Sequence, residues 1–325
     1  MDSMILNNKM YLLDGSFISG ITPYVDIDSV MKHPLWGSHL LLNNEDAVIC
    51  SHKDYIRSGA DFLTTVTYQA SIGGFQKYLN LDYDQSFELI KKSVMVCRQA
   101  ITEENVERNI QIMGSVGPYG ASLRDCSEYN GNYIDTMNLK ELYDWHKPRI
   151  QALVEAGVDM MLFETIPSII EATVLLNILT EFPNQKACLS FSCKDGNCLS
   201  HGENFSSAVE MFWSNDYRKQ LIAIGMNCLH PKFITPLLMS IKTNNVNFIA
   251  YPNGGGIWDV TQNCYDDTQI YKVSIDDLKI WNNKGLKIFG GCCKTDAIEI
   301  ARLRSLMDDL LKSNDTRFCV ELNNT

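Results

Sequence analysis

Eight short apolar segments, separated by longer stretches of helical periodicity, are the feature that most restricts how this 325-residue chain can fold. The segments cover residues 10–15, 61–68, 110–117, 159–165, 186–193, 221–228, 247–254 and 286–291. Most are apolar at consecutive positions, a pattern typical of parallel strands that are buried on both faces. Because eight strand–helix units are the number that closes a (β/α)8 barrel, we predict an α/β protein with a TIM barrel fold.

The main alternative is an open, doubly wound α/β sheet. No G-x-G-x-x-G sequence follows any of the eight segments, so the usual signature of a dinucleotide-binding sheet is missing. The chain shows no linker-like change of composition and no internal repeat, and we therefore expect a single domain over residues 1–325. Residues 14–45, which include Pro23, Pro34 and Gly37, are expected to form an elaborated loop after the first strand.

Several short sequences predict where helices begin or end. The S-x-x-E sequences at 168–171 and 207–210 have the form of a capping box, which predicts a helix start at each serine. Thr295 is in a position to cap the last helix, and Gly157 is in a position to end the helix before the fourth strand. Pro148 is expected to kink or restart that helix.

The charge pattern restricts the possible partners. The formal net charge is −11, and the longest basic cluster is the pair Lys91–Lys92, whereas nucleic-acid-binding proteins usually carry a basic patch. No apolar run reaches the roughly 18 residues of a membrane-spanning helix, and the N-terminus lacks the pattern of a signal peptide. We therefore expect a soluble cytoplasmic protein that binds small molecules, with no nucleic-acid or membrane partner.

The eleven cysteines include three that fall at the ends of predicted strands. Cys228 ends the sixth segment, and Cys292 and Cys293 follow Gly290 and Gly291 at the end of the eighth. In a barrel, alternate strands contribute to the same interior layer, and the glycines allow the backbone to bend so that both neighbouring thiols turn inward. Three thiolates at one point require a soft cation, and three protein ligands with an open fourth position are typical of catalytic zinc. We predict one zinc ion per chain.

The sequence leaves alternative roles open for the cysteines and for a neighbouring histidine. Free cysteines often fill apolar cores, and Cys193 and Cys198 in "SCKDGNC" form a rival pair of thiols. His230, two residues after Cys228, is a candidate fourth ligand. A fourth protein ligand would close the metal site, which would exclude a substrate from it.

Seven sequence blocks occur together in one order, namely "LLDGS", "TTVTYQAS", "GSVGPYGA", "EAGVDMMLFETIPS", "GMNC", "YPNGG" and "GGCCKT". In this respect the chain resembles the homocysteine S-methyltransferase family over about residues 10–312. It is most similar to the shorter members, which use S-methylmethionine or S-adenosylmethionine as methyl donor. The betaine-dependent members carry a longer C-terminal extension used in oligomerisation, and its absence favours a monomer.

The resemblance implies roles for particular residues. It implies a zinc ion bound by Cys228, Cys292 and Cys293, and homocysteine held with the help of Asp14, Gly15 and Glu164. Two carboxylates suit the α-ammonium group of an amino-acid substrate, and a charged residue after the apolar run "MMLF" needs a partner or a function. Asp14 is alternatively a turn residue at a strand end.

Three further residues are expected to contact the substrates: Thr65 and Tyr68 as part of the donor pocket, and Asn227 as a hydrogen-bond donor to a substrate carboxylate. The chain departs from the family pattern at Ser16, where a second glycine is usual, and at Lys294, where arginine is usual. Because arginine forms forked contacts that lysine cannot reproduce, the change at position 294 alters any carboxylate contact made there.

The function predicted from these features is zinc-dependent methyl transfer from a sulfonium donor to the thiol of homocysteine, giving methionine. A free thiol with a pKa of about 8.5 is only slightly ionised at neutral pH, whereas a metal-bound thiol is deprotonated. Three alternatives remain open: selenocysteine or another small thiol as acceptor, betaine as donor, and a non-catalytic zinc or redox sensor on the same fold.

Overall fold

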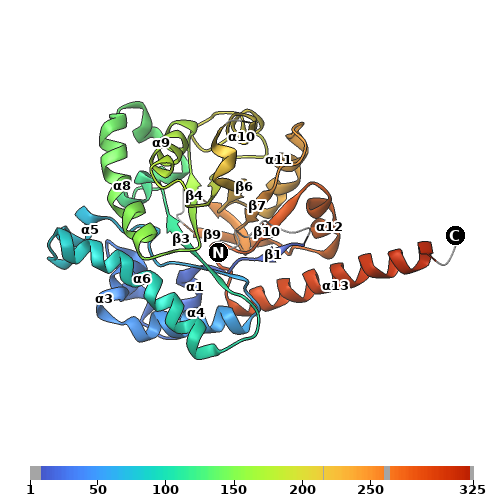
Figure 1. Ribbon diagram of the computed structural model, residues 1–325, viewed down its shortest axis with the longest axis horizontal. Coiled ribbons are helices and arrows are strands. Elements are labelled where there is room, and N and C mark those ends of the chain that lie inside the picture. The colour runs from blue at the N-terminus through green and yellow to red at the C-terminus, as the bar shows by residue number, and fades with distance from the viewer. Residues whose placement is uncertain (1–8, 215, 260–263, 323–325) are drawn as a thin grey trace.

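The eight predicted strands form one closed, all-parallel barrel in the computed structural model, which describes residues 9–214, 216–259 and 264–322 (Figure 1). The strands are β1 (Tyr11–Leu12), β2 (Phe62–Thr64), β3 (Gln111–Val116), β4 (Met160–Ile166), β5 (Ala187–Phe191), β6 (Leu221–Asn227), β7 (Phe248–Tyr251) and β10 (Leu286–Phe289). Their hydrogen-bonded order is β1-β10-β7-β6-β5-β4-β3-β2, and a parallel bridge between Leu13 and Phe62 joins the two ends. The predicted TIM barrel fold is confirmed.

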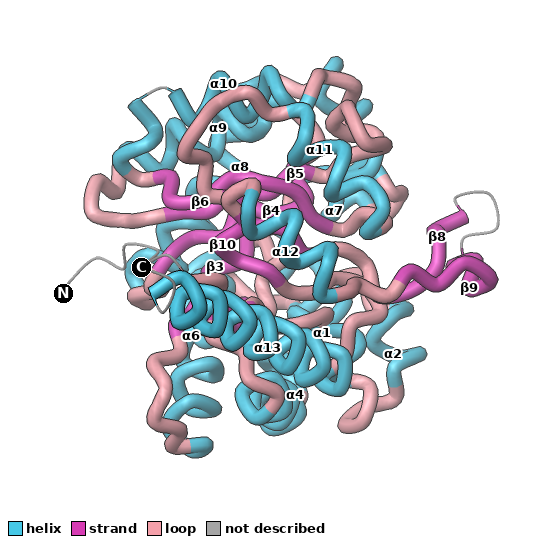
Figure 2. Tube along the Cα trace, turned by 90° about the vertical axis from the view of Figure 1, so that its right-hand side faces the viewer, coloured by secondary structure: helices cyan, strands magenta, loops and turns pink. Residues whose placement is uncertain are grey.

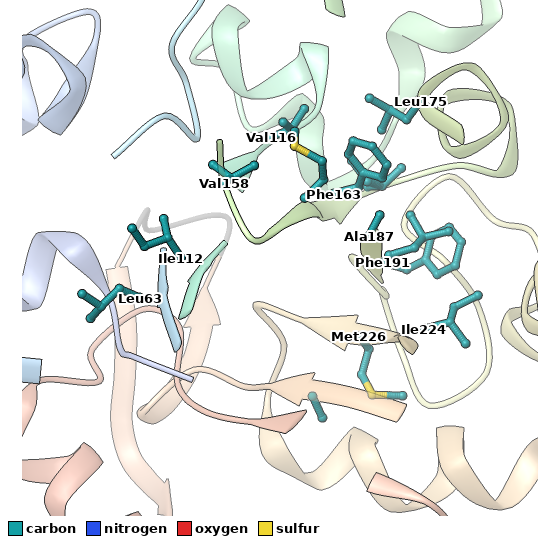
Figure 3. Packing of buried hydrophobic residues seen from close by; sticks show 14 of the residues in the cluster. Leu63, Ile112, Val116, Val158, Phe163, Leu175, Ala187, Phe191, Ile224 and Met226 are labelled. Carbon is teal, nitrogen blue, oxygen red and sulfur yellow. The ribbon is translucent and has the colours of Figure 1, made fainter. Parts of the chain in front are cut away.

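Helices surround this barrel, which explains why the strands are apolar on both faces (Figures 1 and 2). The longer helices are α4 (Glu45–Arg57), α6 (Tyr83–Glu104), α8 (Leu139–Glu155), α9 (Ile169–Thr180), α10 (Phe205–Ser214), α12 (Ile275–Asn283) and α13 (Ala297–Leu322). Side chains such as Met113, Leu162 and Ile288 form a core inside the barrel. Outward-facing residues such as Phe163 and Phe191 belong to a second core that packs against the helices (Figure 3).

Shorter helices lie mainly in the connections at the carboxyl ends of the strands. They are α1 (Phe17–Ile21), α2 (Ile27–Lys32), η1 (Trp36–His39), α3 (Leu40–Asn43), α5 (Ile72–Leu79), α7 (Tyr119–Leu123), η2 (Ser127–Tyr129), η3 (Asn132–Asp135), η4 (Asp216–Lys219), η5 (Pro231–Phe233) and α11 (Ile234–Ser240). The expected loop over 14–45 is therefore a connection built largely from short helices. The α2 helix, for example, begins at Asp26, whose side chain accepts a hydrogen bond from the backbone N–H of Asp28.

Two of the predicted helix starts are wrong. The α10 helix begins at Phe205 rather than after Ser207, because the side chain of Asn204 accepts the backbone N–H of Ser207 at 3.0 Å. The α13 helix is capped by Asp296, which accepts the N–H of Glu299 at 2.9 Å, and not by Thr295. In both places another good capping residue lies close to the one that we predicted.

The remaining predictions about helix ends have mixed outcomes. Ser168 caps α9 as expected, because its hydroxyl accepts the N–H of Glu171 at 3.1 Å. The carboxylate of Glu171 turns instead to the ring of His146, so it does not complete a capping box. Gly157 follows the end of α8 with φ of +77°, which confirms its predicted role, whereas α8 continues through Pro148 without a restart.

One feature was not predicted. After β7 the chain forms an antiparallel hairpin of β8 (Gly255–Asp259) and β9 (Cys264–Tyr271), which projects away from the barrel (Figure 2). A scan of the helices within residues 9–214, 216–259 and 264–322 finds none with the length and apolarity required to cross a membrane.

Candidate metal and substrate site

A cavity lies where the carboxyl ends of the barrel strands meet, which is the position of active sites in TIM barrel enzymes. We call it the rim cavity. Its wall includes Asp14, Thr65, Ser115, Glu164, Cys228 and Cys292. Because these residues lie at or just after the ends of six different strands, only closure of the barrel brings them together.

Three thiols form one side of the rim cavity. The sulfur atoms of Cys228, Cys292 and Cys293 all lie within 4.8 Å of one another, and the first and last are 3.6 Å apart. Zinc–sulfur bonds of about 2.3 Å in a tetrahedral site would place two sulfurs about 3.8 Å apart. The spacing therefore fits a soft metal ion bound by three thiolates.

The fourth side of this thiol group is open to the rim cavity. Among the described residues no histidine or carboxylate joins the three sulfurs as a further ligand. The Nδ1 atom of His230 instead accepts the backbone N–H of Lys232 at 3.1 Å, and its ring packs against Phe233 and Tyr271. A ligand can therefore reach the thiol group from the cavity.

The backbone that carries the thiols is held from two directions. The N–H of Cys292 donates to the carbonyl of Pro252 at 2.7 Å, and the carbonyl of Cys293 accepts the N–H of Gly254 at 2.7 Å. The two glycines before the cysteines do not have positive φ values, so our explanation by backbone bending is wrong. They are required by close packing, since a Cβ added at Gly291 would lie 2.1 Å from Cγ2 of Thr295. Cys228 itself adopts a left-handed conformation with φ of +53°.

Electrostatics explain why these thiols need a cation. Hydrogen bonding to Cys228 and Cys293, together with burial, raises the pKa of Cys292 well above its usual range. The three thiols thus resist ionising together unless a positive charge lies between them. The hydroxyl of Tyr129, which we did not predict as a site residue, lies 3.0 Å from the sulfur of Cys228.

The two predicted carboxylates, Asp14 and Glu164, also belong to the wall of the cavity. Asp14 is 3% exposed and accepts the backbone N–H of Thr64 at 2.7 Å. Burial, reinforced by the charge of Glu164, raises the pKa of Asp14 to about 7. Glu164 accepts hydrogen bonds from the hydroxyls of Ser115 and Tyr251, and burial raises its pKa to about 7. A cation that enters the cavity would therefore lower the pKa of each carboxyl group and favour its ionised form.

The other predicted substrate residues divide into two groups. Gly15, Thr65 and Tyr68 line the rim cavity. Asn227 does not belong to its wall as formed by the described residues. Its side-chain oxygen accepts the N–H of Thr165 at 2.8 Å and its amide nitrogen donates to the hydroxyl of the same residue.

Asn227 therefore stabilises the end of β4 rather than facing a substrate. Thr165 has a φ of +60°, a conformation that costs free energy unless its backbone is held. The residue before it is Glu164, so the hydrogen bonds of Asn227 fix the strand end from which this carboxylate projects. The amide oxygen of Asn227 also accepts the hydroxyl of Ser190 at 2.7 Å.

The structure explains one of the two departures from the family pattern. The hydroxyl of Ser16 accepts the N–H of Ser19 at 3.3 Å and so caps α1. Lys294 is exposed and has a left-handed backbone with φ of +62° in the turn after the cysteines. Among the described residues, the rival thiols Cys193 and Cys198 belong to no group of three potential metal ligands, and the sulfur of Cys198 accepts the side-chain amide of Asn197 at 3.3 Å.

A third carboxylate, Glu128, escaped the sequence analysis. It lies in η2, within the connection between β3 and α8, and is 5% exposed. Burial raises its pKa to about 7. Its sequence signal is weak because site residues of a barrel are expected at the strand ends. Glu128 lies twelve positions beyond Val116, the last residue of β3.

Comparison with known proteins identifies relatives across nearly the whole chain. The family model for homocysteine S-methyltransferases matches residues 11–307. A betaine-homocysteine S-methyltransferase from Drosophila melanogaster is 38% identical, over 91% of this chain and 93% of that protein. The homocysteine S-methyltransferase of Escherichia coli is 33% identical, over 83% of this chain and 87% of that protein. The metallated form of the homocysteine methyltransferase MmuM from Escherichia coli is 31% identical in structural alignment, with a TM-score of 0.78, covering 91% of this chain and 96% of that chain.

The fold and the site first define a class: a (β/α)8 barrel enzyme whose rim combines a cluster of three thiols with buried carboxylates. Within this class the chain belongs to the homocysteine S-methyltransferase family, as the match over residues 11–307 shows. The predicted family is therefore confirmed, and the protein is a methyltransferase rather than a non-catalytic sensor.

Proposed function

We propose that the protein transfers a methyl group from a sulfonium amino acid to the thiol of homocysteine, with one zinc ion held by Cys228, Cys292 and Cys293. The observation that carries this proposal is the group of three thiols, within 4.8 Å of one another, whose open side faces the rim cavity. Thiolate ligands in tetrahedral geometry favour zinc, and an open fourth position is the mark of a catalytic rather than a structural site.

When bound, zinc would supply a Lewis acid that keeps the acceptor thiol deprotonated at neutral pH. The hydroxyl of Tyr129 lies 3.0 Å from the sulfur of Cys228, where it can donate a hydrogen bond that disperses the negative charge of this thiolate. The hydrogen bonds of the cysteine pair with the carbonyl of Pro252, which accepts, and the N–H of Gly254, which donates, fix the direction in which the open side faces.

Asp14 and Glu164 would bind the α-ammonium group of homocysteine, next to the backbone of Gly15. Both carboxyl groups have pKa values raised to about 7 by burial, and an ammonium group beside them would lower these values again. Binding energy from this ammonium would thus hold the sulfur at one place and orient it for in-line attack.

The donor would occupy the side of the cavity lined by Thr65 and Tyr68. A lone pair on the homocysteine sulfur forms the new sulfur–carbon bond while the sulfur–carbon bond of the donor breaks. After the transfer, the thiolate of homocysteine and the sulfonium of the donor have both become neutral thioethers. The reaction therefore removes one negative and one positive charge. Because the described wall of the cavity contains carboxylates but no lysine, arginine or histidine, it favours a donor that carries net positive charge.

Betaine is the second candidate donor, supported by the relative from Drosophila melanogaster that is 38% identical. Our sequence argument from a longer C-terminal extension does not separate the donors here, since this chain covers 93% of that relative. Selenocysteine remains an alternative acceptor, because nothing in the thiol group distinguishes sulfur from selenium. A monomeric state and a cytoplasmic location remain predictions.

The proposed function is tested with purified, zinc-loaded protein, homocysteine, and equal concentrations of S-methylmethionine, S-adenosylmethionine or betaine. Methionine formation is measured by liquid chromatography and mass spectrometry, with a donor labelled in the methyl group. We expect the label in methionine with a sulfonium amino acid and much less with betaine. Labelled methionine from betaine alone would contradict the donor assignment, and none from any donor would contradict the proposed function.

A further inference from the structure

Glu128 is a buried carboxylate of which one oxygen lacks a hydrogen-bond partner among the described residues. The residue lines the rim cavity at 5% exposure, and its Oε2 atom is buried without a partner among the described residues. Asp14 and Glu164 differ in this respect, since both accept hydrogen bonds from neighbouring protein groups. A buried carboxylate oxygen without a donor is unfavourable in free energy, so its presence in a cavity indicates a missing ligand.

The backbone around Glu128 is fixed, so the carboxylate cannot easily turn away to water. Its carbonyl accepts the hydroxyl of Ser192 at 2.8 Å, and a Cβ added at Gly120 would lie 2.8 Å from its backbone nitrogen. The next residue, Tyr129, contacts the sulfur of Cys228 at 3.0 Å. Glu128 is therefore held at the cavity wall beside the thiol group.

The missing partner has to come from the ligand. The described cavity wall contains no lysine, arginine or histidine that could pair with the carboxylate. An ionised carboxylate oxygen accepts any hydrogen-bond donor, and a donor that also carries positive charge forms the strongest such bond. In the proposed function, the ammonium of homocysteine is already assigned to Asp14 and Glu164.

We infer that Glu128 binds the α-ammonium group of an amino-acid methyl donor and so selects donors that carry this group. The inference rests on the proposed function. A primary ammonium supplies the N–H that Oε2 lacks, whereas the quaternary nitrogen of betaine and the sulfonium sulfur have no hydrogen to donate. S-Methylmethionine and S-adenosylmethionine contain such an ammonium. Dimethylsulfoniopropionate has the same reactive sulfonium without it and is therefore the matched donor.

The test compares zinc-loaded wild-type protein with the Glu128→Gln variant and with Glu107→Gln, a control at an exposed glutamate. For each protein, kcat/KM is measured for S-methylmethionine and for dimethylsulfoniopropionate at saturating homocysteine. It is then measured for homocysteine at saturating S-methylmethionine. Zinc content and melting temperature are measured on the same samples.

We expect kcat/KM for S-methylmethionine to fall about 10- to 100-fold in Glu128→Gln, the effect of losing one buried charge-assisted hydrogen bond. The values for homocysteine and dimethylsulfoniopropionate should change less than about threefold, and Glu107→Gln should match wild type. An equal fall for both donors, an equal fall for donor and acceptor, or an unchanged value for S-methylmethionine would overturn the inference.

A binding measurement separates this inference from the proposed function. If the wild-type protein forms no methionine from any donor, the proposed function fails. Titration calorimetry of S-methylmethionine into zinc-loaded wild-type and Glu128→Gln protein then decides the role of Glu128. A Kd that is about tenfold weaker in the variant would support ammonium binding, and equal values would overturn it.

Discussion

The thiols and the carboxylates of the rim cavity differ in what raises their pKa values. The sulfurs of Cys228, Cys292 and Cys293 lie within 4.8 Å of one another, and hydrogen bonding among them raises the pKa of Cys292. Asp14 and Glu164 come from separate strands, and burial is the main cause of their raised pKa values. Thiols that crowd one another favour one shared metal cation, whereas buried carboxylates favour an ammonium group that enters the cavity.

Removing a thiol should have the largest effect. In Cys292→Ala, only two of the three protein ligands remain. We expect zinc per chain to fall from about one to near zero, because two thiolates bind zinc much more weakly than three. We expect kcat/KM to fall at least about 1,000-fold, since the acceptor loses both deprotonation and positioning. Metal content is measured by inductively coupled plasma mass spectrometry and activity by methionine formation.

The matched control for this change is Cys50→Ala, which removes a half-buried thiol from α4, outside the described cavity wall. It should keep the zinc content and activity of wild type. Full zinc occupancy and activity in Cys292→Ala would show that the thiol side does not hold the metal.

Removing a carboxylate should have an intermediate effect, limited to the acceptor. In Glu164→Gln, the remaining carbonyl oxygen can still accept a hydrogen bond from one of the hydroxyls of Ser115 and Tyr251, but the other acceptor oxygen and the negative charge are lost. We expect kcat/KM for homocysteine to fall about 100-fold at pH 7.5 with zinc content unchanged, as for a buried ammonium–carboxylate pair that loses one charge. Zinc loss in this variant would show that the thiols and the carboxylates of the cavity do not act separately.

The pH dependence follows from the same carboxylates. Their pKa values are raised to about 7, so lowering the pH through 7 protonates them and removes their attraction for an ammonium group. Because two carboxylates are protonated, we expect wild-type kcat/KM for homocysteine to fall by up to about 100-fold per pH unit well below this value. The decline should be shallower in Glu164→Gln. A wild-type profile that is flat between pH 5.5 and 7 would contradict a role for ionised Asp14 and Glu164.

The smallest effect is expected from Tyr129→Phe, which removes the hydroxyl that lies 3.0 Å from the sulfur of Cys228. Hydrogen bonds to metal ligands tune affinity without supplying a ligand, and we expect zinc binding about tenfold weaker in competition with a chelator. Tyr24→Phe is the control, because Tyr24 is equally exposed at 36% and its hydroxyl bonds Asp54 instead. Equal zinc affinity in both variants would exclude Tyr129 from the metal environment.

The barrel and the thiol group could be predicted from the sequence for physical reasons. Strands covered on both faces must be apolar at consecutive positions, and this leaves a readable pattern. Closure of eight such strands then brings Cys228 near Cys292 and Cys293, because the carboxyl ends of parallel strands meet at one rim. Even here the role of Gly291 was misjudged, since its constraint is the neighbouring Thr295 and not its own backbone conformation.

Competition between neighbouring side chains for the free N–H groups of a helix explains the wrongly predicted helix starts. Asn204 and Asp296 each lie within three residues of the caps that we predicted, and the side chain that reaches a free N–H depends on the path of the preceding loop. Asn227 was misplaced for a related reason. Its position at the end of a strand segment indicated a substrate contact, but its amide forms hydrogen bonds with Thr165 of β4, across the intervening strand β5.

By itself the sequence determined the family, the number of barrel strands and the grouping of the three thiols. These depend on short sequence blocks or on the regular geometry of parallel strands. Only the tertiary structure decided the roles of Glu128 and Tyr129. Both lie in a connection whose path over the barrel is set by packing against segments such as Gly120 and Ser192. A carboxylate is notable only when it is buried without a partner, and burial is a property of the folded chain.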